Sequence, residues 1–271
     1  DIDKDTLAFG CVGHDTSQAD DTGAVYIFTR LDGKWTQQAR ITAEDGKEGD
    51  HFGGAVAVQG AQIVIGAAFA DLFGIPDTGV VFVYIGRAGN WYQQARLAPA
   101  FPQLGGYFGY TVAIDEPLLV VGAPEGGNPL EREIGSAYVF ERTANGWQQT
   151  IRLKPEDGRE GDYFGASVAV SSGTVAVGAI FNDPDLGNGR ITSGGAVYLY
   201  GEGPTGWTQE SMLVLDNAAA FDYFGYSIDL SNRTLVVGAS GKNGPGTLRS
   251  GMAYVYERQG KAWQQVTYLF P

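Results

Sequence analysis

The chain has 271 residues, 44% of them hydrophobic, and its 31 acidic residues outnumber 18 basic ones, giving a formal net charge of −13. So acidic a surface repels the phosphates of nucleic acids and anionic lipids, which excludes both as expected partners. No stretch of about 18 consecutive apolar residues occurs, so we expect no membrane insertion. The single cysteine, Cys11, leaves no disulfide framework within the chain.

One phrase recurs along the whole sequence at a period of about 56 residues. Each copy contains a tryptophan, and the five tryptophans are Trp35, Trp91, Trp147, Trp207 and Trp263. A Phe-Gly pair recurs at Phe52, Phe108, Phe164 and Phe224. A Gly-Ala step recurs at Gly66, Gly122, Gly178 and Gly238, with Gly10-Cys11 as its fifth copy. Such self-similarity is typical of a repeat architecture.

Four strands are predicted in each unit. In the second unit they cover residues 51–58, 62–68, 79–85 and 91–97, and in the fourth they cover 164–170, 174–179, 195–200 and 207–213. These segments are short, rich in Val, Ile, Tyr and Phe, and bounded by glycine and polar turns. A four-stranded unit cannot bury both of its faces alone, so neighbours must stack. We therefore predict an all-β fold, a β-propeller of five four-stranded blades forming one domain over residues 1–271.

The loops are expected to divide between the two ends of the propeller. In an antiparallel meander successive connections alternate between ends. The short turns after the first and third strands then share one end, and the long loops after the second and fourth strands share the other. Most of the acidic residues fall in these long loops, which we call the long-loop face.

The phrases FGASVAV from Phe164, VVGA from Val120 and GSAYVF from Gly135, the last before Trp147, resemble the FG-GAP repeat family. This family includes the integrin alpha-subunit propeller and many bacterial surface proteins. The resemblance covers nearly the whole chain and implies a propeller that is extracellular or on the cell surface and acts in recognition or adhesion. The integrin repeat often carries an Asp-rich calcium loop between its first two strands. Here that connection is a tight turn, so no calcium ligand is transferred to this chain.

Four aromatic residues directly precede the Phe-Gly pairs: His51, Tyr107, Tyr163 and Tyr223. One interpretation is that they pack structurally where each blade begins. The alternative is a ring of planar side chains at the mouth of the central channel, which could stack on sugars.

A second candidate site lies between the second and third units. Phe69, Phe73 and Phe101 fall in long loops that the meander brings to one face, where other units carry acids. They form either an exposed apolar patch for a partner or a small core beneath the loop.

The acidic phrases EDGKEGD, with Asp45 and Asp50, and EDGREGD, with Asp157 and Asp162, are each interpreted as solvated turns in which acids accept backbone N–H groups. We expect no cofactor and assign no metal ligand, with weak calcium binding at these loops as the alternative. A pair of carboxylates suited to glycoside hydrolysis can always be found on so acidic a face, so its presence carries little weight.

These observations favour a non-catalytic, extracellular recognition or adhesion propeller that binds a protein or a glycan through its long-loop face. A polysaccharide-acting enzyme at the channel mouth and a structural protomer of a cell-surface assembly are the alternatives. Ile2 aligns with Val58 and Leu269 with Leu213, so about 13 residues of a repeat are missing where first and last units meet. We expect either a longer chain or an open edge suited to self-association.

Overall fold

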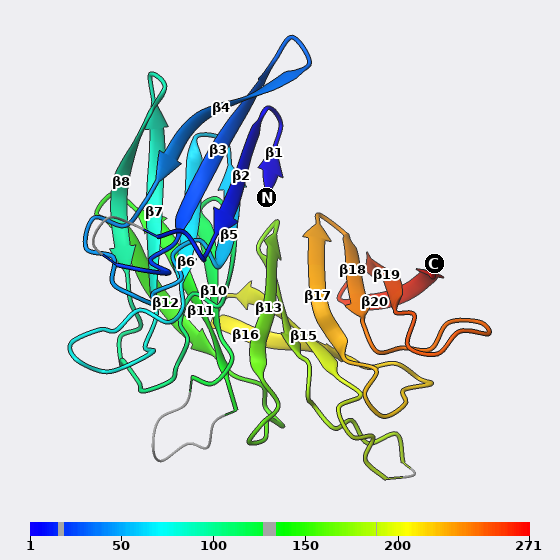
Figure 1. The fold of residues 1–271 in the computed structure, drawn as a ribbon. Helices are drawn as coiled ribbons and strands as arrows, with labels where there is room; N and C mark the ends of the chain where they lie inside the picture. The colour runs from blue at the N-terminus through cyan, green and yellow to red at the C-terminus, as the bar shows by residue number, and fades with distance from the viewer. Residues whose placement is uncertain (16–18, 127–133, 188) are drawn as a thin grey trace.

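The structure, a computed structural model, describes residues 1–15, 19–126, 134–187 and 189–271. Every regular element in this part of the chain is a β-strand, and the strands form five antiparallel sheets of four. The sheets, which we call blades 1 to 5 in chain order, follow one another around an axis lined by the first strand of each blade (Figure 1). The predicted all-β propeller of five four-stranded blades is confirmed.

Each blade keeps its strands in chain order from the axis outward. Blade 1 comprises β1 (Ile2–Asp3), β2 (Thr6–Cys11), β3 (Ala24–Leu31) and β4 (Lys34–Ile41). Blade 2 comprises β5 (Ala55–Gln59), β6 (Gln62–Ala67), β7 (Val80–Arg87) and β8 (Asn90–Leu97). Blade 3 comprises β9 (Thr111–Asp115), β10 (Leu118–Ala123), β11 (Ser136–Thr143) and β12 (Gly146–Leu153). Blade 4 comprises β13 (Phe164–Ser171), β14 (Thr174–Ala179), β15 (Ala196–Gly203) and β16 (Gly206–Leu213). Blade 5 comprises β17 (Phe224–Ser231), β18 (Thr234–Ala239), β19 (Met252–Gln259) and β20 (Ala262–Leu269).

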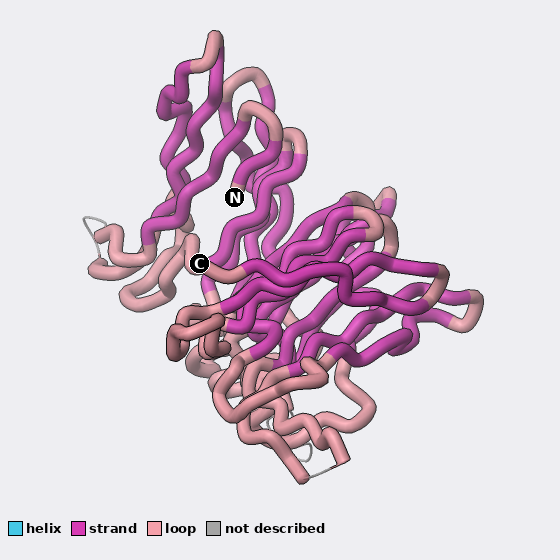
Figure 2. Tube along the Cα trace, turned by 90° about the vertical axis from the view of Figure 1, so that its right-hand side faces the viewer, coloured by secondary structure: helices cyan, strands magenta, loops and turns pink. Residues whose placement is uncertain are grey.

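The recurring residues occupy equivalent places. Each tryptophan is the second residue of an outer strand, where it pairs with the third strand of its blade. The long loops gather along one side of the molecule, as Figure 2 shows. The long loops also touch each other, since the Gly105 N–H donates to the Pro76 carbonyl.

Neighbouring blades pack a face of large rings against a face of small aliphatic side chains. At the junction of blades 3 and 4, Phe164 is fully buried and lies edge-on to Tyr198 and Tyr200, with ring centroids 5.5 and 6.1 Å apart. Val120 and Val139 of blade 3 belong to the same core. The burial of these apolar side chains away from water stabilises the contact between consecutive blades.

Two glycines let neighbouring backbones approach closely at each junction. A Cβ added to Gly122, of the Gly-Ala step, would lie 2.1 Å from the carbonyl oxygen of Gly165 in the next blade. The same relation links Gly10 with Gly53, at 1.9 Å. Only glycine fits at these positions, which explains why both glycines recur.

A hydrogen bond joins each blade to the next at the short-turn end. The donor is the backbone N–H of the residue directly after the first strand of one blade. The acceptor is a side-chain oxygen of the last residue in the first strand of the preceding blade. We call these contacts the inter-blade clasps. The four pairs are Asp3 with Gly60, Gln59 with Glu116, Asp115 with Ser172, and Ser171 with Asn232, at 2.7, 2.8, 2.7 and 3.0 Å.

Blades 1 and 5 share no sheet and, over the described residues, do not pack on each other as consecutive blades do. Their outward faces are exposed as a result. Phe9 on β2 is 60% exposed, whereas Ile65, at the equivalent position in blade 2, is fully buried. Val236 on β18 is half-buried, whereas Val64, at the equivalent position in blade 2, is fully buried.

Candidate functional site

A row of aromatic residues lies where the first strands of blades 2 to 5 begin, at the long-loop end of the axis. His51, Tyr107, Tyr163 and Tyr223 all have left-handed backbone conformations, with φ of 54, 49, 58 and 54°. Such angles cost a residue with a Cβ about 1 kcal/mol or more. The conformation recurs because each residue closes a turn, its carbonyl accepting the N–H three residues later.

Side chains from the long loops after the second strands fill the gaps between these residues. Phe69 lies between His51 and Tyr107, with ring centroids 4.9 and 5.1 Å away. Phe181 lies between Tyr163 and Tyr223 at 4.8 and 5.8 Å.

Glu125 occupies the equivalent position in blade 3, where its carboxylate accepts the Tyr163 hydroxyl at 2.5 Å. We call the combined row the aromatic arc: His51, Phe69, Tyr107, Glu125, Tyr163, Phe181 and Tyr223.

The arc is partly open to solvent. Phe69 and Phe181 are 38% and 36% exposed, and the other rings of the arc are half-buried. A cavity of about 380 Å³ adjoins its first part, lined by Val12, His51, Gly54, Phe69, Gly109 and Tyr110 among others. Partly exposed rings beside a cavity suit a ligand that presents flat apolar surfaces.

Burial and nearby carboxylates raise the pKa of two phenols of the arc. The hydrogen bond to Glu125, with burial and the charge of Glu125, raises the pKa of Tyr163 to about 12. Burial, then Glu125 and Asp77, raises the pKa of Tyr107. Both phenols are protonated at neutral pH, as an ordinary tyrosine also is, and the single proton of Tyr163 is donated to Glu125.

The structure separates the three phenylalanines that the sequence grouped together. Phe69 belongs to the arc, whereas Phe73 and Phe101 stand at loop tips and are 86% and 77% exposed. These two rings do not form the small core that was the alternative to a patch. In the loop that carries Phe69 and Phe73, the residues that join the core of blades 1 and 2 are Ala70 and Leu72.

Sequence reasoning missed Phe181 and Glu125. Their position, two residues after each Gly-Ala step, holds Phe69, Glu125, Phe181 and Gly241 in blades 2 to 5. Aligning that variable position, rather than the repeated ones, would have found them.

The acidic loops form hydrogen-bonded turns. Asp50 accepts the N–H of Lys47 at 2.8 Å, and Asp162 accepts that of Arg159 at 2.9 Å. Burial raises the pKa of each carboxyl above its ordinary value of 3.8. In the described part of the chain no group of three or more His, Cys, Asp or Glu side chains is placed to hold a metal ion.

The channel itself is lined mainly by aliphatic residues of the first strands, such as Val56, Val112 and Val168. Among the described lining residues Asp1 and Asp229 are the titratable ones. Residues 127–133, which include the long-loop residues Glu131, Arg132 and Glu133, lie outside the described part. The described part contains no helix with the length and apolarity to span a bilayer.

Comparison with known proteins gives matches over most of the chain. The model of the FG-GAP repeat matches residues 35–84, 91–140, 147–200 and 207–256. Integrin alpha-2 from Mus musculus is 34% identical over 140 residues, and integrin alpha-2 from Bos taurus is 34% identical over 143. Each alignment covers 47% of this chain but 12% of the integrin, so the match concerns a small part of those proteins.

Proposed function

Because this chain belongs to the FG-GAP repeat family, we propose that it is a non-catalytic propeller of the cell surface or extracellular space that recognises a glycan at the aromatic arc. The similarity to integrin alpha-2 supports the extracellular setting and a role in adhesion. We infer a glycan as the ligand because exposed rings alternate along the aromatic arc with a carboxylate and with phenols.

Sugars fit this arrangement chemically. The C–H faces of a pyranose stack on aromatic rings, and its hydroxyl groups pair with phenols and carboxylates. Phe69 and Phe181 supply exposed rings, Glu125 supplies an acceptor, and Tyr107 supplies a phenolic donor. The formal charge of −13 opposes anionic sugars, so we infer a neutral glycan.

The test is a glycan-array screen followed by calorimetry on the strongest neutral ligand. Phe181→Ala and Phe69→Ala should each weaken binding about fivefold or more, since stacking contributes roughly 1–3 kcal/mol per ring. The matched control is Tyr92→Ala, because Tyr92 is 53% exposed on the outer strand β8. Equal losses in the control and arc variants, or binding of no neutral glycan, would refute the proposal.

A second candidate function is protein docking through the loop tips. Phe73 and Phe101 are large rings exposed on one face, which is typical of an interaction site. If a partner protein docks there, Phe73→Ser abolishes its binding in a pull-down with purified surface proteins, whereas Phe181→Ala does not. The opposite pattern assigns protein binding to the arc.

We further propose self-association through the exposed faces of blades 1 and 5. Phe9, Tyr26 and Trp35 give blade 1 an outward face of rings, and Val236, Ala253 and Val255 give blade 5 one of small side chains. These are the two kinds of face that meet at the internal junctions. Sedimentation of the 271-residue protein should show concentration-dependent association that Phe9→Asp removes. A monomer at all concentrations would overturn this proposal.

A further inference from the structure

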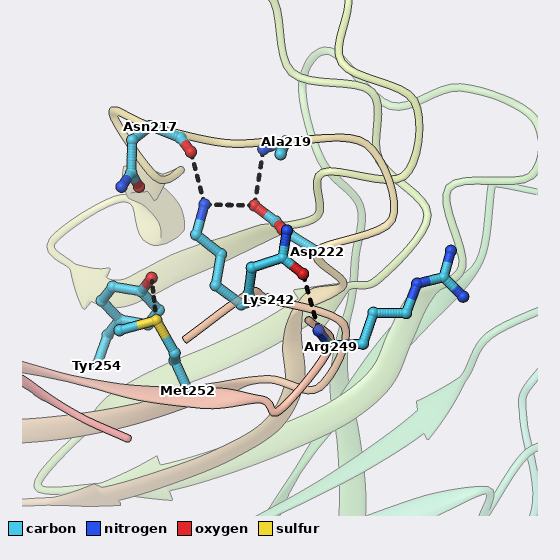
Figure 3. Close-up of polar contacts among 8 residues, drawn as sticks. Asn217, Ala219, Asp222, Lys242, Arg249, Met252 and Tyr254 are labelled. Carbon is cyan, nitrogen blue, oxygen red and sulfur yellow. Dashed lines mark hydrogen bonds and ion pairs between the residues drawn. The ribbon is translucent and has the colours of Figure 1, made fainter. Parts of the chain in front are cut away.

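Blades 4 and 5 share a polar cluster beneath their long loops, but differ in its charge. In blade 5 the ammonium of Lys242 lies between the carboxylate of Asp222, at 2.7 Å, and the main-chain carbonyl of Asn217, at 2.6 Å (Figure 3). The side chains of Lys242 and Asp222 are 8% and 3% exposed. One positive charge therefore balances one buried carboxylate.

Blade 4 has the same backbone with different side chains. Asn182 occupies the position of Lys242, since both N–H groups donate to the alanine of the Gly-Ala step, Ala179 or Ala239. Asp162 occupies the position of Asp222, and each accepts a turn N–H three residues earlier. Asp157 replaces the neutral Asn217. The cluster thus carries two carboxylates and has lost its ammonium.

The remaining contacts in blade 4 draw these oxygens together. The hydroxyl of Tyr198 donates to Asp157 at 2.9 Å, and Nδ2 of Asn182 lies 3.1 Å from Asp162 and 3.3 Å from the Tyr198 hydroxyl. Asn182 is 3% exposed, and its Oδ1 is buried with no hydrogen-bond partner among the described residues. A buried carbonyl oxygen without a partner is costly, so it calls for a ligand.

Among the described residues no ammonium or guanidinium contacts these carboxylates as Lys242 contacts Asp222, and Arg159 acts on Asp162 only from a longer distance. Over the described residues neither Asp157 nor Asp162 forms an ion pair. In blade 2, by contrast, Arg96 lies 3.6 Å from Asp45. The position of Arg96 on the outer strand is held in blade 4 by Met212.

We propose that blade 4 binds one calcium ion through the carboxylates of Asp157 and Asp162 and the side-chain oxygen of Asn182, with water completing the shell. Two carboxylates match a doubly charged ion, as one carboxylate matches the ammonium in blade 5. All three ligands are oxygens, which calcium prefers. Rotation of the Asn182 amide would turn its unpartnered oxygen toward the ion, in place of the Nδ2 that now donates to Asp162. Because Asp157 is exposed and the protein ligands are few, the affinity should fall in the range of extracellular modules, about 10⁻⁴ to 10⁻³ M.

The other acidic loop is not expected to bind. Blade 2 carries Asp45 and Asp50, but Ala70 stands at the position of Asn182 and offers no side-chain oxygen. The stoichiometry should therefore be one.

The experiment is calcium titration by calorimetry at fixed ionic strength, with magnesium and potassium as separate titrants. Terbium luminescence provides a second readout, since Tyr198 would transfer energy to a bound lanthanide. Asn182→Lys, which copies blade 5, should lower calcium affinity at least about tenfold while the melting temperature without calcium is retained. The matched control Asp45→Asn should leave binding unchanged. Converting blade 5 with the pair Lys242→Asn and Asn217→Asp should install a second site.

Several results would overturn the proposal. These are the absence of saturable calcium binding, retention of that binding in Asn182→Lys, an equal loss in Asp45→Asn, or potassium binding at least as tightly as calcium. A second calcium ion bound by the unmodified protein would also contradict it.

Discussion

The buried pair of Lys242 and Asp222 gives the sharpest stability prediction. Charges 2.7 Å apart attract by about 6 kcal/mol at an effective dielectric constant of about 20, and desolvation of both groups offsets most of that. Lys242→Met leaves Asp222 buried beside an apolar chain. We therefore expect the free energy of unfolding to fall by about 3–5 kcal/mol.

The assay is urea unfolding of a double-mutant cycle. Asp222→Asn keeps an oxygen for the Ala219 N–H, which Asp222 accepts at 2.7 Å, but removes the charge. The double variant should be more stable than the sum of the single losses by about 1–3 kcal/mol. The exposed pair of Arg30 and Asp5 is the control, and Arg30→Met should cost less than about 1 kcal/mol. A loss below about 1 kcal/mol for Lys242→Met, or additive losses in the cycle, would refute the reasoning.

Three further predictions concern stability. Gly122→Ala should lower the free energy of unfolding by more than about 2 kcal/mol, because its Cβ would lie 2.1 Å from the Gly165 oxygen. Gly203→Ala, whose Cβ would have no neighbour closer than 3.7 Å, should change it by less than about 0.5 kcal/mol, and similar losses for both would contradict the close approach. Phe73→Ser should alter denaturant unfolding by less than about 0.5 kcal/mol, whereas Phe164→Ala should cost about 3–5 kcal/mol; a large loss at Phe73 would restore the small-core interpretation. Burial raises the folded-state pKa of Asp50, so the folded state takes up its proton more readily and stability should rise as pH falls from neutrality toward 3.8. Asp50→Asn should reduce that rise, measured by melting temperature against pH, and an unchanged profile would show that other groups cause it.

The repeated positions could be predicted from sequence because each blade makes the same demand on them. Phe164 and Gly165 recur since every junction needs a buried ring and a close backbone approach. The position of His51, Tyr107, Tyr163 and Tyr223 was also readable, although their left-handed backbone was not, since such conformations favour glycine.

What the sequence did not reveal lies at positions that change from blade to blade. Glu125 completes the arc where its neighbours have Phe69 and Phe181. An alignment of the repeats shows that Lys242 in blade 5 stands where blade 4 has Asn182. Only the structure shows that Lys242 contacts Asp222 and that Asn182 contacts Asp162. Phe69 was grouped with Phe73 and Phe101 because all three lie in long loops, and loop conformation is not encoded by a repeating pattern.

Within these 271 residues each inter-blade clasp joins one blade to the next, so the five blades form a linear series of coupled units. Blades 2, 3 and 4 are each held from both sides, whereas blades 1 and 5 are held from one. Local opening should then begin at the two outer units and spread inward. Amide hydrogen exchange would record this as a gradient, with the slowest exchange in β10 and β14 and faster exchange in β2 and β18. The aromatic arc runs from blade 2 to blade 5. Its last residue, Tyr223, therefore belongs to a blade that opens more readily than blades 2, 3 and 4.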